Sequence, residues 1–566
     1  MYILFSDDSF ILFHSSKVKS MTEASVCPKC RKSPLKFRSL EGFRRGFALK
    51  FEVSCEHCGV VQSDYTSPQI VEDGESVNTS RHPFEVNRRS VLAAKEVGLG
   101  QSELVRMMAV MNVEGGLHHK TYHSISKQLH QRLLHGPAAE HLANTHDIVR
   151  SAYEDLHGPT DGPQEITVSY DGTWHIKGHT SSVGACFVID SLTGLVLDFV
   201  VLSKYCAECE LAGSKLEGSD KEDWMEAHAP NCDRNHEGSS GSMEVAGAKM
   251  LWGRSVDVCG MKYVALIGDG DAAVLEALNT LNPYGGEIQK EQCINHVAKR
   301  MYKGLERLVK EVDSQAKVSK KTKRSLSSEA ADATRLSIKM SGRGRMTKER
   351  MKKFSSYYRK AIVENAPDVE ASRNSVWAIL FHSLSTLDDP HHTFCGSWCW
   401  YKEAQQQGKD PAEVYGLVKH DPPLPKDLCE LIVPLFERLA DRNLLKRCMQ
   451  LQTSNANESL HSTLWQRAPK SKYCGRKTVE TATALALMQF NKGSTGLVDA
   501  AECLGVQSGR PLEELSKRRD HTRLYQAERD CSQESKAHRK KKSVLKVRRE
   551  DTLQSQEGHL YQAGGH

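Results

Sequence analysis

The sequence has 566 residues, of which 39% are hydrophobic and 26% charged, and a formal net charge of +6. This length exceeds what one hydrophobic core organises, so we expect about three or four domains. No run of roughly 18 apolar residues is present, which excludes a membrane-spanning helix. Asp7 and Asp8 interrupt the apolar N-terminal stretch, which argues against a secretory signal.

The sequence predicts an ordered series of segments. The expected ranges are a loose leader at 1–20, a zinc ribbon at 21–62, a linker at 63–86, a helical segment at 87–160, the first part of an α/β core at 161–298 with a Cys/His insertion at 203–242, a basic helical insertion at 299–446, the last part of the core at 447–495, and a basic, largely disordered tail at 496–566.

The chain has 17 cysteines, and six of them form CxxC pairs with histidines nearby, which favours metal binding over disulfides. Near the N-terminus, Cys27 and Cys30 form one CxxC pair, and Cys55 and Cys58 form another. Four thiolates satisfy the tetrahedral preference of zinc, and the intervening residues can form a hairpin, so the sequence predicts a zinc ribbon. Recognition of DNA ends and a purely structural role are both open for it.

Residues 87–156 have helical apolar spacing and are expected to form two or three helices. The pattern then changes, because Ile166, Val168 and Tyr170 alternate with polar residues in the period of a strand. Two further apolar runs, Val183–Ile189 and Leu195–Leu202, predict antiparallel strands. A helix and the buried strand Tyr263–Ile267 are expected after the Cys/His insertion.

That insertion carries Cys206, Cys209, His228 and Cys232, a CxxC followed by HxxxC, which predicts a zinc knuckle with His236 as a competing ligand. A third site, formed by Cys395 and Cys399 with His391 or His392, is a weaker hypothesis.

Three acidic residues follow elements of this core. Asp171 is expected at the end of the first strand, Asp269 at the end of the later buried strand, and Glu458 on the first turn of a helix. Phosphodiester cleavage by two divalent ions needs such oxygen ligands, and this order of elements is typical of a ribonuclease-H-like domain. Alternatively, the Asp-Gly pairs are turns and Glu458 closes a capping box with Asn455.

The short sequence motifs around these acids form a longer pattern. In order they are Ser169-Tyr-Asp-Gly-Thr-Trp174, Ser203-Lys-Tyr-Cys206, Gly241-Ser-Met-Glu244, Arg254-Ser255, Gly268-Asp-Gly-Asp271, Lys290–Arg300, Ser397-Trp-Cys399 and Asn457-Glu458. This series resembles the Mutator-like transposase domain family of eukaryotic DNA transposons. The resemblance implies a ribonuclease-H-like core, a catalytic triad at Asp171, Asp269 and Glu458 with Asp271 as the alternative second acid, and Mg or Mn ions.

The pair Cys293-x-x-His296 resembles the CxxH motif that follows the second acid in this family, and we expect it to support the site. Two features depart from the family pattern: Gln292 stands where the family has Glu, and the segment His392–Cys399 is shorter than its counterpart.

The expected function is divalent-metal-dependent cleavage and strand transfer of transposon ends, with zinc in structural roles. The partners are double-stranded DNA, both terminal inverted repeats and target, and a second copy of the chain; no membrane is involved. The alternatives are a domesticated DNA-binding or regulatory protein, a structural zinc protein, and a nuclease that does not join strands.

The positive charge agrees with such partners. Residues 299–360 hold 20 Lys and Arg against 6 Asp and Glu, and residues 517–549 hold 13 against 4. Such segments suit contact with a phosphate backbone, although a solvated face is an equally common origin. The run Arg539-Lys-Lys-Lys542 is the candidate nuclear-localisation signal, so a nuclear location is expected.

Overall fold

The computed structural model describes residues 10–71, 82–176, 180–268, 272–323, 338–415 and 421–539, together with 541, 542, 545 and 549; for 41 and 316–323 it describes the backbone alone. The chain divides into two compact units. The terminal unit comprises Met1–His141, Leu464–Pro469 and Lys477–His566, and the core unit comprises Leu142–Thr463 and Lys470–Arg476. Across the described ranges, every helix is too short or too polar to cross a membrane.

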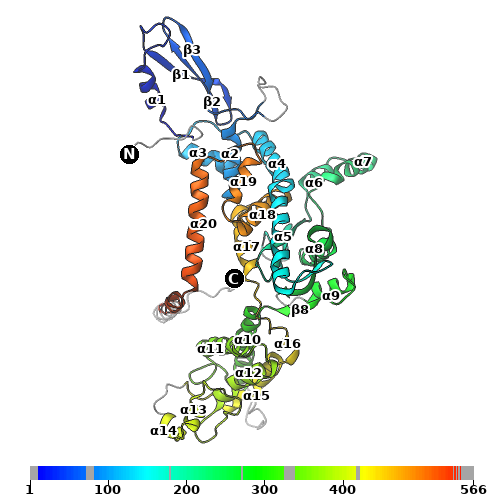
Figure 1. Ribbon diagram of the computed structural model, residues 1–566. Helices are drawn as coiled ribbons and strands as arrows, with labels where there is room; N and C mark the ends of the chain where they lie inside the picture. Colours follow the sequence, from blue (N-terminus) through cyan, green and yellow to red (C-terminus); the bar gives the residue numbers. More distant parts are fainter. Residues whose placement is uncertain are drawn as a thin grey trace. The chain divides into compact units, whose positions relative to one another are not determined.

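The terminal unit contains an antiparallel three-stranded sheet next to helix α1 (Ser15–Glu23), in the order β1 (Leu35–Arg45), β2 (Ala48–Cys55) and β3 (Gly59–Tyr65) (Figure 1). At the β1–β2 turn, Gly46 has a φ of 67°, and a Cβ there would lie 2.6 Å from Oδ1 of Asn87. The same oxygen accepts a hydrogen bond from the backbone N–H of Phe47 at 2.9 Å. Position 46 therefore requires glycine, because this turn lies against the helix that carries Asn87.

Helices form the rest of the terminal unit. They are α2 (Glu85–Glu96), α3 (Gln101–Val110), α4 (His119–His135), the start of α5 (Pro137–His157), nearly all of α18 (Arg476–Asn491), α19 (Gly496–Glu502) and α20 (Arg510–Cys531). Four helices thus lie where the sequence predicted two or three. Helices α19 and α20 lie within the stretch expected to be largely disordered, and Ala500, Leu504 and Val506, in and just after α19, are buried. Helix α1 likewise begins within the expected leader.

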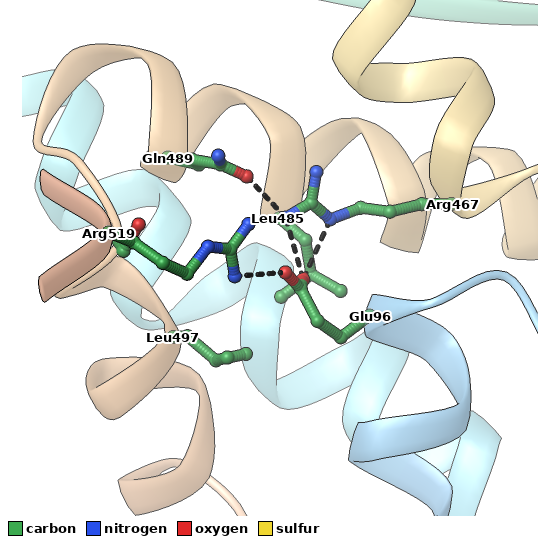
Figure 2. A pocket seen from close by; sticks show the side chains of 7 residues that line it. Glu96, Arg467, Leu485, Gln489, Leu497 and Arg519 are labelled. Atoms are coloured by element: carbon green, nitrogen blue, oxygen red, sulfur yellow. Dashed lines mark hydrogen bonds and ion pairs between the residues drawn. The ribbon is translucent and has the colours of Figure 1, made fainter. Parts of the chain in front are cut away.

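An ion-pair cluster in the terminal unit joins residues of α2, α18 and α20 to Arg467, the last residue of the helix Asn455–Arg467 (Figure 2). Nη2 of Arg467 lies 2.6 Å from Oε2 of Glu96 and donates to Oε1 of Gln489 at 2.5 Å. Arg519 reaches the other oxygen of Glu96 at 3.2 Å. The Arg467 side chain is 4% exposed and that of Glu96 is 12% exposed, so this charge pair is largely withdrawn from water.

The core unit is built on a five-stranded sheet in the order β6-β5-β4-β7-β8. Strands β4 (Gln164–Trp174), β5 (Val183–Asp190) and β6 (Val196–Ser203) are antiparallel, whereas β7 (Met261–Gly268) and β8 (Gln289–Gln292) continue the sheet in parallel. The first four strands lie where the apolar patterns predicted strands. Every residue of β5 is buried, which shows that both faces of the sheet are covered.

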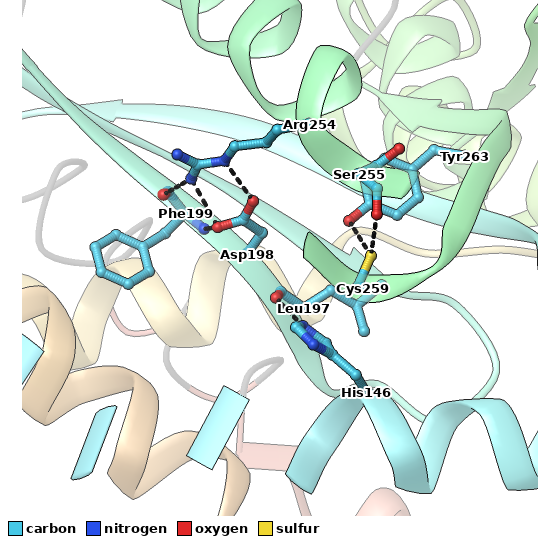
Figure 3. A network of polar contacts seen from close by, with 8 residues as sticks. All are labelled: His146, Leu197, Asp198, Phe199, Arg254, Ser255, Cys259 and Tyr263. Atoms are coloured by element: carbon cyan, nitrogen blue, oxygen red, sulfur yellow. Dashed lines mark hydrogen bonds and ion pairs between the residues drawn. The ribbon is translucent and has the colours of Figure 1, made fainter. Parts of the chain in front are cut away.

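One face of this sheet packs against α5, α8 (Ser242–Cys259) and α9 (Ala272–Leu281) in a shared core that includes Tyr170 and Trp252. Figure 3 shows polar contacts that fix α8 on the sheet. Arg254 donates two hydrogen bonds to the Asp198 carboxylate on β6, at 2.8 and 2.9 Å. The Cys259 thiol contacts the hydroxyl of Tyr263 on β7 at 3.3 Å.

The insertion between β8 and the last core helix has a hydrophobic core of its own, which includes Leu305, Phe354 and Phe436. Its elements are α10 (Ile294–Lys323), α11 (Lys348–Asn365), α12 (Val369–Leu384), α13 (Trp400–Gln406), α14 (Pro411–Tyr415), η3 (Lys426–Leu428), α15 (Cys429–Leu439) and α16 (Arg442–Lys446); α17 (Asn455–Arg467) follows. Helices form most of the described residues of this stretch. The smaller Cys/His insertion holds α6 (Ala207–Gly213), α7 (Gly218–His228) and η1 (Ala229–Asn231).

Candidate active site and metal centres

Asp171 lies on the central strand β4. The sequence placed it at the end of a strand, but β4 continues to Trp174 because its pairing with β5 persists, with Asp171 opposite Phe187. The parallel pairing with β7 ends earlier, at Ser169 opposite Ile267. The carboxylate therefore stands where β4 loses its parallel neighbour, and its side chain is 36% exposed.

Glu458 lies in the first turn of α17, as the sequence predicted. A carboxylate in this position interacts favourably with the positive end of the helix dipole. Its side chain is 61% exposed and lies 3.7 Å from Nε2 of His296. A ligand therefore has access to the Glu458 carboxylate.

Two contacts join the helix of Glu458 to the strand of Asp171. The amide of Asn457, which is fully buried, donates a hydrogen bond to the hydroxyl of Ser169 at 2.8 Å. One turn further along α17, Nδ1 of His461 lies 3.9 Å from Oδ2 of Asp171, and its ring contacts Phe187. Asp171 and Glu458, distant in sequence, thus flank one helix–strand contact.

The sequence reasoning missed His461. Burial, followed by the positive charge of Lys470, lowers the pKa of His461 to about 4, so its ring is neutral at physiological pH. The signal for it was the spacing Glu458-x-x-His461, which places both side chains on one face of a helix.

The CxxH pair holds the start of α10 against the approach to α17. The buried Cys293 thiol accepts hydrogen bonds from the backbone N–H and the hydroxyl of Ser454, both at 3.4 Å. Three residues later, His296 contacts Glu458. Neither side chain belongs to a Cys/His cluster of metal-ligand type among the described residues.

Asp269 and Asp271 lie outside the described residues. The chain is described again from Ala272, where α9 begins, and β7 ends at Gly268, immediately before Asp269 in the sequence.

The four N-terminal cysteines come together at one end of the three-stranded sheet. Cys55 ends β2, Cys58 precedes β3, and Cys27 and Cys30 follow α1, with all four sulfurs within 4.8 Å of one another. For Cys27, the backbone N–H of Cys30 is the largest influence and lowers the pKa of the thiol to about 7, which favours the thiolate that a metal binds. This cluster could bind zinc.

The second cluster joins α6, α7 and η1. Sγ of Cys206 lies 3.3 Å from Nε2 of His228, and Sγ of Cys209 lies 3.4 Å from Sγ of Cys232. Glu208 contacts the other ring nitrogen of His228 at 3.2 Å, the kind of contact that orients a metal-binding histidine.

The competing ligand His236 is not part of this second cluster. It contacts the backbone oxygen of Ser239 at 3.1 Å and the hydroxyl of Ser242 at 3.0 Å instead. The cluster of Cys206, Cys209, His228 and Cys232 could therefore bind zinc without it.

A third cluster lies within the helical insertion and consists of His382, His392, Cys395 and Cys399. The sequence analysis missed His382. This residue lies near the end of α12, and a loop separates it from the other three donors, so no short Cys/His spacing indicates it. The alternative ligand His391 points elsewhere, with Nε2 3.1 Å from the carboxylate of Asp389.

The family model of the Mutator-like transposases matches residues 10–399, which include the N-terminal cysteines, Asp171 and the CxxH pair but not Glu458. No curated protein matches the chain. Because the match covers more than half of the sequence, the chain belongs to the Mutator-like transposase family.

Proposed function

We propose that this chain is a transposase that cuts and joins DNA ends at a site formed by Asp171, Asp269 and Glu458, with Asp271 as the alternative second acid. Membership of the family implies DNA binding and a transposase-type activity. The contact of Asn457 with Ser169 carries the assignment of Glu458, because it holds the helix of that acid on the strand of Asp171. This support is independent of the family match, which ends before Glu458.

We propose that the core unit is ribonuclease-H-like. The sheet order β6-β5-β4-β7-β8 supports this, since three antiparallel strands are followed by a crossover to two parallel strands. The register supports the second acid, because Ser169 pairs with Ile267 and each strand's acid follows two residues later in the sequence. We also propose the domain boundaries that the sequence predicts, in which the Cys/His insertion at 203–242 and the helical insertion at 299–446 interrupt this core.

The carboxylates fit a pair of hard divalent cations. Asp171 and Glu458 are accessible oxygen donors, and the ring beside Asp171 is neutral because burial lowers the pKa of His461 to about 4. Bound Mg²⁺ or Mn²⁺ would activate the attacking oxygen and stabilise the leaving oxygen. The protein's own contribution is positional: Asn457 holds α17 on β4, and Cys293 and His296 hold α10 beside Glu458.

We propose that the substrates are the transposon's terminal inverted repeats and target DNA, and that two or more copies of the chain assemble on them in the nucleus. The basic residues of the helical insertion and of the C-terminal segment supply charge for phosphate contacts. In the run Arg539–Lys542, Lys540 lies outside the described residues.

A cleavage and strand-transfer assay on the element's terminal repeats tests this function. Wild type is compared with Asp171→Asn, in Mg²⁺ or Mn²⁺ and in EDTA, and with Asp161→Asn as the control, since Asp161 is an exposed acid of the same unit. We expect metal-dependent products that Asp171→Asn abolishes and the control retains. Repeat-specific binding without cleavage would favour a domesticated DNA-binding protein, and hydrolysis without joining would favour a nuclease.

A further inference from the structure

We propose that His382, His392, Cys395 and Cys399 bind a third zinc ion, which fixes the loop between α12 and α13 within the helical insertion. The four donors come from the end of α12 and from the loop that leads to α13. His392, Cys395 and Cys399 are buried, and His382 is half-buried. Two thiolates and two neutral imidazoles balance the charge of Zn²⁺, which suits a site withdrawn from water.

The distances between the donor atoms match a tetrahedral zinc site. With Zn–N of about 2.0–2.1 Å and Zn–S of about 2.3 Å, tetrahedral geometry separates two nitrogens by about 3.3 Å, and a nitrogen from a sulfur by about 3.6 Å. The two Nδ1 atoms of His382 and His392 are 3.2 Å apart. The four distances between these nitrogens and the two sulfurs lie between 3.4 and 3.7 Å. Five of the six donor–donor distances therefore agree with a tetrahedral zinc site.

Ser385 supports the required form of His392. Its hydroxyl lies 2.8 Å from Nε2 of His392 and also accepts the backbone N–H of His391 at 3.0 Å. If Nε2 carries the proton and donates it to Ser385, the lone pair of Nδ1 faces the other three donors. A partner of this kind sets the tautomer of a metal-binding histidine.

Among the described residues, the loop has no ladder of backbone hydrogen bonds. Its described backbone hydrogen bonds include only short turns such as Cys395 to His392 and Cys399 to Gly396, both 3.1 Å. The small apolar cluster beneath it contains Ala378, the two cysteines and Tyr401. A metal cross-link between α12 and the loop would replace the missing ladder of hydrogen bonds.

The site forms one wall of a cavity of about 810 Å³, which His382, His392, Trp398 and Trp400 help to line. Trp398 packs edge-on against His382, and Trp400 packs edge-on against His392. Fixing the two histidines would therefore help to fix Trp398 and Trp400 on this side of the cavity.

Metal analysis of the purified full-length protein tests the site. We expect three zinc ions per chain in wild type and one fewer in Cys399→Ser and in His382→Ala. His391→Ala is the matched control, since His391 is adjacent in sequence but outside the cluster, and should retain all three. Equal zinc content in wild type and Cys399→Ser would overturn the proposal.

A second measurement uses the wild-type protein alone, so it does not depend on a variant that folds. Thiol alkylation, read by peptide mass spectrometry, should modify Cys395 and Cys399 much faster after a zinc chelator is added, and added zinc should restore protection. Cys448, a buried cysteine of the same insertion outside any described cluster, is the control and should not respond. Protection of Cys395 and Cys399 that is unchanged by the chelator would refute the site.

Discussion

Replacing Asn457 by Ala tests whether the contact between α17 and β4 positions the candidate site. The change removes the 2.8 Å hydrogen bond to Ser169 and leaves that hydroxyl buried, since Ser169 is 3% exposed. An unsatisfied buried group of this kind costs about 1–3 kcal/mol. A displacement of about 1 Å at a catalytic group lowers rates by roughly 10²-fold. We therefore expect DNA cleavage to fall roughly 10- to 100-fold while binding to repeat DNA is retained.

The assay is a double-variant cycle on the cleavage rate, with Asn457→Ala, Ser169→Ala and the combined variant. If the two side chains act through their mutual bond, the combined loss, expressed as an activation free energy, is smaller than the sum of the two single losses by about 0.5–3 kcal/mol. Asn455→Ala is the control. Asn455 lies on the same turn of α17 as Asn457, and its side chain makes an exposed contact with Asn295 on α10. Independent effects of Asn457 and Ser169 would refute the inferred contact, and an unchanged cleavage rate in Asn457→Ala would refute its role in positioning Glu458.

Three further predictions concern the rest of the chain. Glu96→Gln leaves the buried Arg467 without its carboxylate, so we expect the terminal unit to lose about 3–5 kcal/mol of stability, measured as a lower thermal unfolding temperature; an unchanged temperature would show the pair to be dispensable. Cys55→Ser should remove one zinc ion and the amide-exchange protection of β2 and β3, leaving exchange in the core unit unchanged. His296→Ala should slow cleavage without changing the zinc content, because the ring contacts Glu458 and no described zinc cluster; loss of zinc would place His296 in a metal site instead.

The sequence predicted local features well. Alternating apolar residues predicted β4, and CxxC spacing predicted two of the Cys/His clusters, because both patterns depend on neighbours in sequence. His382 could not be predicted, since only the packing of α12 against the following loop brings it to Cys395 and Cys399. The continuation of β4 beyond Asp171 likewise depends on pairing with β5, which a single strand's pattern does not reveal.

The helical insertion has its own hydrophobic core. The rest of the core unit therefore needs only to hold the two ends of the insertion together. It does so beside Glu458: the N–H of Gln292 donates to the backbone of Arg447 at 2.8 Å, that of Ile294 to Gln452 at 3.1 Å, and Ser454 contacts Cys293. The entropic cost of closing a loop grows only slowly with its length, so a long insertion is tolerated if its base is well bonded. The next residues after that base form the first turn of α17, so the base of the insertion and Glu458 are adjacent along the chain. The CxxH pair lies at this base, where Cys293 contacts Ser454 and His296 contacts Glu458.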